Sequence, residues 1–386
     1  MSASQTPGFG LILLLWGAGL GAAAQYGKVS VIFDMLPQAY PDAGPAIGWI
    51  VSLVGFVGIV FGVVAGLVVA RIRYRRALLW ALWAGALVSC LQALLPPLPW
   101  MLLSRVVEGA SHLAIVVAAP TLIAQLASDR MRGFALTLWG TFFGVAFAVL
   151  AFAGRPLAEA HGLPALFLAH GGYLAVFALI LAARLRALPE EGAQPAFSVA
   201  QVIRDHGTIY RSPALSAPAI GWLFYTFSFV SILTVIPPYI DESLRAAVMT
   251  AMPLMSIVSS MTLGVLLLRF TSAVGVVIGG FALSALCMIW LWLVPGDPMA
   301  CLALAGTLGL IQGASFAAVP QLNAAPASQA QANGAMAQMG NVGNTLGTPI
   351  MAFALVQMGY AALPVLAGAA FVAGLAAHLV LAARRA

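Results

Sequence analysis

Three side chains that can carry charge stand close together in one strongly apolar stretch. Arg105, Glu108 and His112 lie within residues 99–127, at a spacing that puts them on one face of a helix. Arginine can hold a carboxylate or phosphate through two hydrogen bonds, and glutamate and histidine can carry protons. The spacing predicts a site that binds an ion or handles a proton. A purely structural Arg105–Glu108 pair is the alternative.

A second charged group occurs in an earlier apolar stretch. Lys28 is the only lysine in the chain, and it lies nine residues before Pro37, while Glu108 lies nine residues after Pro99. At a helical rise of 1.5 Å per residue, both are roughly 14 Å from the outer ends of their helices, so we expect them to meet. Gln25 lies one turn before Lys28 and is a further candidate for binding.

Asp34 follows Lys28 in the same stretch and is a candidate for proton coupling together with Glu108. It lies near the outer end of its helix and about 120° around the helix from Lys28. This position favours a role at the rim or as a helix cap.

The second half of the chain offers neutral polar groups at corresponding places. Tyr225, Gln312, Ser315 and Asn341 lie within apolar stretches, and no acidic or basic side chain occupies the middle of these stretches. We expect these four residues to complete a binding site by packing and hydrogen bonding.

These residues belong to a chain that cannot cover itself with a water-soluble surface. Of its 386 residues, 62% are hydrophobic and 7% are charged, against about 25% charged in soluble domains. The sequence therefore predicts an all-α integral membrane protein, since lipid-exposed backbone must form its hydrogen bonds within helices. Twelve stretches are long enough to span a membrane: 9–36, 46–70, 77–95, 99–127, 133–153, 163–183, 214–239, 246–268, 272–294, 299–322, 334–357 and 361–382.

The basic residues predict which side each loop faces. Thirteen arginines fall on the side that holds both termini, two fall on the other side, and Lys28 and Arg105 lie within spans. The positive-inside rule then puts both ends in the cytoplasm, with the chain in the plasma (bacterial inner) membrane. The net charge of +6 is thus a topology signal, and it does not point to nucleic acid. The thirteen are Arg71, Arg73, Arg75, Arg76, Arg130, Arg132, Arg184, Arg186, Arg204, Arg211, Arg269, Arg384 and Arg385.

The chain contains an internal duplication. RVVEGASHLA at 105–114 is echoed by GLIQGASFAA at 309–318, and the second copy has lost its charges. We predict a six-helix bundle over 1–183, a cytoplasmic linker over 184–213 and a second six-helix bundle over 214–386. Two duplicated six-helix halves are a transporter layout.

These features resemble the major facilitator superfamily of transporters over essentially the whole chain. Arg105-Val-Val-Glu108-Gly109 resembles the family's Arg-x-x-Gln/Glu-Gly motif. Residues 66–76 resemble its loop motif between helices two and three, which implies a gating role for Arg71, Arg75 and Arg76. This stretch departs from the family at Ala70, where an aspartate is usual. The resemblance further implies a monomer and a cavity lined by helices one, four, seven and ten.

A further departure concerns the substrate. Drug:proton antiporters of this superfamily carry an acidic residue before a Leu-Pro pair, and alignment on Leu36-Pro37 puts Lys28 at that position. Lys28 and Arg105 together favour a small anionic organic solute, moved by alternating access and coupled to protons. Glu108 is the first candidate for the proton carrier and His112 the second.

Three other functions remain open. One is efflux of apolar or cationic drugs, another is movement of a neutral solute such as a sugar, and the third is a non-transporting assembly or sensor protein on the same fold. The sequence contains no HExxH, GxSxG or GxxxxGK[ST] motif. We therefore expect no enzymatic activity, no cofactor and no bound metal; the expected partners are the solute, protons and membrane lipids.

Overall fold

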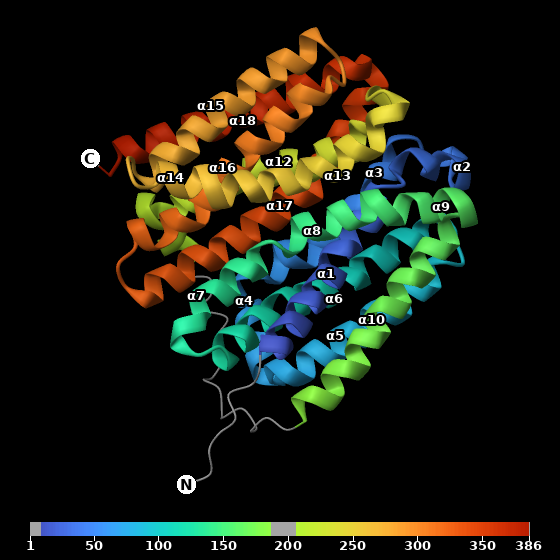
Figure 1. Cartoon of the computed structure of the whole chain (residues 1–386), viewed down its shortest axis with the longest axis horizontal. Coiled ribbons are helices and arrows are strands. Elements are labelled where there is room, and N and C mark those ends of the chain that lie inside the picture. The colour runs from blue at the N-terminus through green and yellow to red at the C-terminus, as the bar shows by residue number, and fades with distance from the viewer. Residues whose placement is uncertain (1–8, 187–205, 386) are drawn as a thin grey trace. The chain divides into compact units, whose positions relative to one another are not determined.

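The computed structural model describes residues 9–186 and 206–385, apart from the side chains of 63, 64, 66, 67, 70, 129, 326 and 327. Every regular element within these ranges is helical (Figure 1). The expected all-α class is confirmed. Much of the expected linker, residues 187–205, lies outside the described part of the chain, as does Arg204.

The first half of the chain forms long helices joined by short turns. They are α1 (Phe9–Ser30), η1 (Phe33–Met35), α2 (Leu36–Ala39), η2 (Pro41–Ile47), α3 (Gly48–Ser52), η3 (Leu53–Gly55), α4 (Phe56–Ile72), α5 (Tyr74–Gln92), α6 (Leu98–Leu126), α7 (Asp129–Gly140), α8 (Phe142–Val149), η4 (Leu150–Gly154), α9 (Arg155–His161) and α10 (Leu163–Leu185).

The second half follows the same plan. Its elements are α12 (Pro213–Val235), η5 (Pro237–Tyr239), α13 (Glu242–Ser259), η6 (Ser260–Gly264), α14 (Val265–Leu267), α15 (Ala273–Leu293), α16 (Pro298–Leu322), α17 (Pro326–Met358), η7 (Gly359–Ala361) and α18 (Ala362–Ala383).

Ten helical segments of the described residues are long and apolar enough to cross a membrane. One of them, Ser328–Ala383, contains α17 from its third residue onward and all of α18, so the ten cover eleven of the expected spans. The remaining expected span, 77–95, corresponds to the 19-residue α5. The helices are therefore consistent with twelve crossings.

Local chemistry explains several helix ends. The first helix ends at Ser30, short of the expected residue 36, and Pro37 lies in the first turn of the following α2, where a helix does not need its N–H. Before α13, Asp241 accepts a hydrogen bond from the Ser243 N–H at 2.9 Å, and the bonds from Ser243 lower the pKa of Asp241. Asp297 caps α16 by accepting from the Ala300 N–H at 2.7 Å.

By internal contacts the chain divides into two compact units. Unit 1 comprises the described residues of Met1–Ile32 and Val64–Phe197, and unit 2 those of Phe33–Val63 and Ser198–Ala386. The segment 33–63 thus packs with the second half; for example, the Gln338 side chain donates to the Ile59 carbonyl at 3.2 Å. The division into halves at 184–213 stays a prediction.

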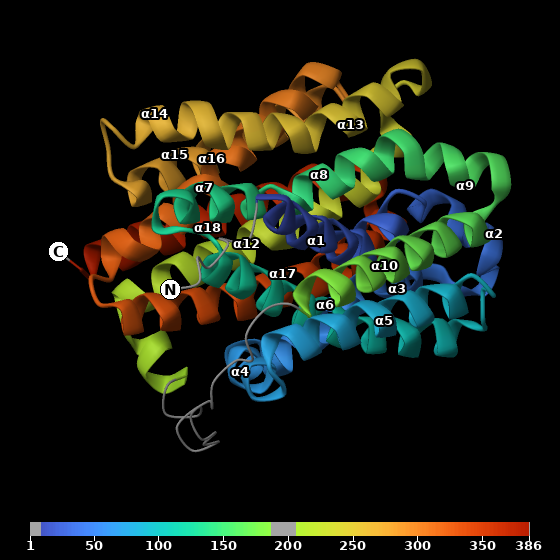
Figure 2. The same ribbon diagram turned by 60° about the horizontal axis from the view of Figure 1, so that its bottom comes forward.

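Unit 1 contains a closed ring of four helices. In it α1 packs against α6 and α10, and α5 packs against the same two helices, as Figure 2 lets the reader follow. Each ring member therefore has two neighbours within the ring, and all four can point side chains at one interior.

Unit 2 repeats this ring with α12, α16, α15 and α18 in the corresponding order. In addition, α17 packs along α12 through glycines. A Cβ at Gly343 would overlap the Leu223 carbonyl oxygen and approach the Phe227 nitrogen at 2.7 Å. Small residues permit this close approach of two membrane helices.

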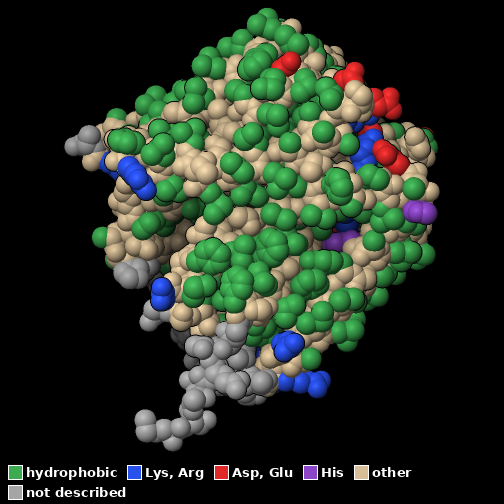
Figure 3. All heavy atoms as spheres, viewed as in Figure 1, with side chains coloured by type: hydrophobic (Ala, Val, Ile, Leu, Met, Phe, Trp, Pro, Cys, Tyr) green, Lys and Arg blue, Asp and Glu red, His purple; other side chains and the backbone are tan. Residues whose placement is uncertain are grey.

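Large apolar side chains stand outside the bundles. Trp80, Phe152 and Phe270 are 65%, 73% and 80% exposed. The face in Figure 3 is covered largely by hydrophobic side chains, with charged groups mostly near its margins. Such a surface is suited to lipid.

Replacing Gly343 by alanine should push α17 away from α12. We expect a lower thermal unfolding temperature in detergent, because forced overlap costs about 1–3 kcal/mol. Gly279→Ala is the control, since nothing lies within 4 Å of a Cβ at that helical glycine. Equal stabilities for both variants would contradict this packing.

Candidate functional site

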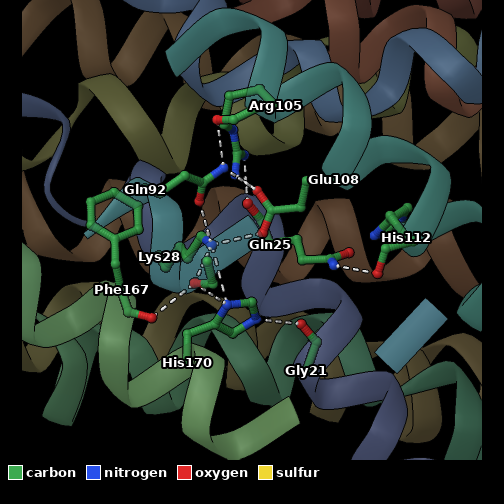
Figure 4. Close-up of polar contacts among 12 residues, drawn as sticks. Gly21, Gln25, Lys28, Gln92, Arg105, Glu108, His112, Phe167 and His170 are labelled. Carbon is green, nitrogen blue, oxygen red and sulfur yellow. Dashed lines mark hydrogen bonds and ion pairs between the residues drawn. The ribbon is translucent and has the colours of Figure 1, made fainter. Parts of the chain in front are cut away.

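The amine of Lys28 lies at the centre of the unit 1 ring and contacts side chains from all three other helices (Figure 4). Its Nζ lies 2.8 Å from both Ser89 Oγ and Gln92 Oε1, 2.7 Å from Glu108 Oε1 and 3.2 Å from His170 Nδ1. The Phe167 ring covers one side, with its centroid 5.2 Å away. An ammonium group has three N–H donors, so four partners exceed what it can satisfy at once.

Glu108 accepts hydrogen bonds on both carboxylate oxygens. Oε1 accepts from Lys28, and Oε2 accepts from Arg105 Nη1 and from Gln92 Nε2, the latter at 2.8 Å. The predicted Lys28–Glu108 contact is therefore confirmed, as an ion pair. The carboxylate is held by two cations at once, and every group involved comes from the ring.

Arg105 and Gln25 connect α6 to α1. Arg105 Nη2 donates to the Gln25 carbonyl at 2.5 Å, and Gln25 Nε2 donates to Ser111 Oγ at 3.0 Å. The Ser111 hydroxyl itself donates to the Ala81 carbonyl. The Ser111 oxygen can therefore only accept from the Gln25 side chain, which fixes the orientation of the Gln25 amide. The buried Oε1 of Gln25 is left without a partner.

His112 lies beside this network. Its Nδ1 is 2.9 Å from the Ala22 carbonyl, which can only accept, so Nδ1 carries the proton of the neutral ring. The ring meets Tyr26 edge-on, with centroids 5.2 Å apart. His112 therefore shares the helical face of Arg105 and Glu108, as expected.

The cluster carries an excess of positive charge. Lys28, Arg105 and Glu108 are all 0% exposed, and with neutral histidines they sum to one positive charge. No other acidic side chain is among the buried residues of the described chain. Burying ions costs several kcal/mol each unless they are paired and hydrogen-bonded. One carboxylate is thus shared by two cations that compete for it.

The candidate residues of unit 2 form an aromatic and hydroxyl-rich region. Tyr225 is buried and stacks on Trp222 and Phe229, with ring centroids 4.6 and 5.4 Å apart. Ser256 donates to Gln312 at 3.5 Å, and the buried Ser315 hydroxyl has no partner.

The remaining candidates lie apart from the hydrogen bonds of the Lys28 cluster. Asn341 is half-buried and donates to the Ala337 carbonyl at 2.8 Å within α17. Asp34 is exposed in η1 and belongs to unit 2. Arg71 lies in the last turn of α4, and Arg75 and Arg76 lie in the first turn of α5. Between the two helices, Arg73 has a positive φ of 76°.

Three members of the cluster were not predicted from the sequence. Ser89 and Gln92, one turn apart on α5, and His170 on α10 supply three of the four partners of Lys28. Each is a polar residue within an apolar stretch, which is the signal that could have found them. The sequence could not show that helices three and six face Lys28.

A helical bundle with a lipid-facing exterior and buried charges is an integral membrane protein with the features of a transporter. The Major Facilitator Superfamily model matches residues 8–348, so the chain belongs to that family. The expected family and its fold are therefore confirmed, and the membership indicates a transporter, not an enzyme.

Individual relatives are more distant. The niacin transporter NiaP of Acinetobacter baylyi is 27% identical over 181 residues, which is 46% of this chain and 40% of that transporter. The match thus spans less than half the length of this relative.

Two solved structures have the same fold. One is a bacterial homolog of the human lysosomal transporter Spinster, in an inward-facing and unoccupied conformation. It is similar with a TM-score of 0.74 and 14% identity, and the match covers 99% of this chain and 96% of the homolog's chain. The transporter FucP in its outward conformation is similar with a TM-score of 0.66 and 14% identity. The match covers 96% of this chain and 98% of the FucP chain. At this identity the likeness concerns the fold alone.

Removing the shared carboxylate should strongly destabilise unit 1. In Glu108→Ala two buried cations lose their counter-ion, and breaking a buried pair costs about 3–5 kcal/mol. Unfolding in detergent, followed by tryptophan fluorescence, measures the change.

Glu159→Ala is the matched control. Its carboxylate pairs with Arg155 at 2.8 Å but is 52% exposed, and such surface pairs contribute about 0–1 kcal/mol. A loss in Glu108→Ala no larger than in this control would mean that the cluster does not hold the ring together.

Proposed function

We propose that this protein is a secondary active transporter of a small organic anion, which it moves together with a proton by alternating access. The observation that carries the proposal is the buried cluster in which Lys28 and Arg105 share the single carboxylate of Glu108. Two cations with one counter-ion offer a place for a second anion, provided that Glu108 releases them.

Charge balance supports coupling to a proton. A monovalent anion that enters alone changes the charge of a buried site, and so does a proton that enters alone; either change is costly in a low-dielectric interior. When both enter, the proton neutralises Glu108 and the anion takes its place between Lys28 and Arg105. The net charge of the cluster stays at one positive, so each ligand favours binding of the other.

The same balance bears on energy coupling. An inside-negative membrane potential opposes the entry of a monovalent anion by roughly 2.3 kcal/mol per 100 mV. An accompanying proton removes this electrical opposition, which favours symport for uptake. In this account Glu108 carries the proton, and Arg105 holds a carboxylate through paired N–H donors.

The niacin transporter relative supports an anionic solute, because niacin is a carboxylic acid and is ionised at neutral pH. Nicotinate is therefore a suitable first probe. Tyr225 and Ser315 of unit 2 remain candidates for binding the solute.

Several finer points belong to the same proposal. We place both termini in the cytoplasm and the protein in the bacterial inner membrane on the basis of the arginine-rich loops. That it acts as a monomer is proposed from the family resemblance alone. Arg71, Arg75 and Arg76 retain their expected role in gating, and Asp34 its role at the outer rim.

Multidrug efflux is the second candidate. The stacked rings of Trp222, Tyr225 and Phe229 are the observation that favours it, because aromatic faces attract lipophilic cations. Thermal stabilisation by lipophilic cations but not by anions would establish this alternative. A non-transporting sensor or assembly protein would move no solute in proteoliposomes.

Anion binding should raise the thermal stability of the purified protein more at low pH than at high pH. A proton on Glu108 frees the two cations, so acid increases the affinity for nicotinate. At 100 times its dissociation constant, a ligand stabilises the folded state by about 2.7 kcal/mol. Unfolding temperatures with nicotinate across a pH series, compared with an uncharged analogue such as nicotinamide, measure this effect.

Glu108→Gln provides the control because its side chain imitates a permanently protonated acid. Nicotinate should still stabilise this variant, but to an extent that does not depend on pH. Stabilisation of the natural protein that is independent of pH, or that grows as pH rises, would contradict the proposal.

A further inference from the structure

We infer that His170 delivers the transported proton to Glu108 by way of Lys28. This inference rests on the proposed proton coupling at Glu108. It concerns a residue that the motifs of the sequence do not point to, and it follows from the hydrogen bonds within the ring.

The surroundings of Glu108 limit how a proton can reach it. Within the described residues, the carboxylate accepts bonds from Lys28, Arg105 and Gln92. A guanidinium does not give up its proton in proteins, and an amide is not an acid at these pH values. Lys28 is therefore the one neighbour in this arrangement that can pass a proton to Glu108.

The surroundings of Lys28 then identify the preceding donor. Its four partners are Ser89, Gln92, Glu108 and His170. A hydroxyl and an amide cannot hold an additional proton near neutral pH, whereas an imidazole can. His170 is thus the group beyond Lys28 that can supply one.

The ring of His170 is held in the form that this role needs. Its Nε2 lies 2.9 Å from the Gly21 carbonyl, which can only accept, so the proton of the neutral ring is on Nε2. Its Nδ1 lone pair then faces Lys28 at 3.2 Å and Ser89 at 2.9 Å. The Ser89 hydroxyl donates to the Phe167 carbonyl, so its oxygen can accept from Nδ1 once that atom is protonated.

The transfer conserves atoms and charge. Lys28 Nζ first gives one of its protons to Glu108 Oε1, which breaks that N–H bond and leaves a lone pair on Nζ. The proton bound at His170 Nδ1 then moves onto this lone pair and restores the ammonium. His170 returns to its neutral form, Lys28 keeps its charge, and Glu108 becomes a neutral acid. The two steps span the 3.2 and 2.7 Å contacts.

The charged and titratable groups near His170 come from α1, α5 and α6, and α9 also packs on α10. Lys28 on α1 faces the ring directly, and Glu108 and Arg105 on α6 lie behind it. The nearby titratable group of α5 is the Cys90 thiol, which lies against Gly171. Helix α9 carries His161 and the Arg155–Glu159 pair.

The duplicated half provides a natural comparison. His378 on α18 lies against Gly221, just as His170 bonds to Gly21, and the two glycines are 200 residues apart. His378 is fully buried, but neither ring nitrogen has a hydrogen-bond partner. His378 is thus a buried imidazole in a corresponding position that does not contact a lysine. A comparison of variants at His170 and His378 separates the effect of losing a buried imidazole from the effect of losing the contact with Lys28.

Transport assays in proteoliposomes with labelled nicotinate test the inference. In His170→Gln, uptake driven by a pH gradient should fall by about a hundredfold, the scale of a lost proton-transfer group. Counterflow exchange at equal pH needs no net proton movement and should persist. His378→Gln, which removes the matched imidazole, should retain both activities. Gradient-driven uptake by His170→Gln at the natural rate would overturn the inference.

A second measurement does not depend on transport. Nitrogen-15 spectra of labelled histidines, assigned with His170→Gln, report which ring nitrogen carries a proton. In Lys28→Gln the neighbouring cation is gone, so Nδ1 of His170 should become protonated as pH is lowered from about 8 to about 5. A ring that takes up no proton at Nδ1 in that variant would also overturn the inference.

The two experiments separate this inference from the proposed function. A natural protein that moves no nicotinate or other small anion would reject the proposed function, while the spectra would still report on His170. A protein that couples normally without His170 would reject only the route of the proton.

Discussion

The structure of unit 1 depends on a single buried carboxylate shared between two cations. Glu108 binds Lys28 from α1 and Arg105 from its own helix, and Gln92 from α5 completes its hydrogen bonds. Because a buried charge without partners is costly, these bonds stabilise the close packing of the four ring helices. The site that holds the ring together is therefore the site where a proton or an anion would have the largest effect. Stability and transport are linked in this account through the same atoms.

The two halves of the chain contain the same ring of four helices, but different kinds of side chain lie within each ring. In unit 2 the ring of α12, α15, α16 and α18 contains hydroxyl groups and aromatic rings where unit 1 contains charges. Gly309 and Gln312 replace Arg105 and Glu108 in the repeated motif, and Gly309 lets α16 approach the backbone of Ser256. Duplication thus supplied the packing geometry twice, whereas the charged network exists in one copy. The charges of the repeated motif are thus confined to unit 1.

The sequence was sufficient for the class and the central ion pair, and its twelve expected spans are consistent with the observed helices. Long apolar stretches and the scarcity of charge predicted the helices. The equal distances of Lys28 and Glu108 from the outer ends of their helices predicted their contact. It was not sufficient for the surroundings of that pair. Whether Gln92 and His170 face Lys28 depends on how α5 and α10 rotate about their axes, and their nearly uniform apolar surfaces do not encode that rotation. The apolar stretch also continues past Ser30, where α1 ends, so apolar length alone did not reveal this helix end.

The most direct test of the central claim is to count the protons taken up when an anion binds. Purified protein in lightly buffered detergent at neutral pH would be mixed with nicotinate while a pH-sensitive dye is followed, and calorimetry would give the amount bound. The protein should take up about one proton per anion, because binding of each favours the other, and Glu108→Gln should take up none. Nicotinate binding without proton uptake by the natural protein would contradict the claim that the anion replaces Glu108 between Lys28 and Arg105.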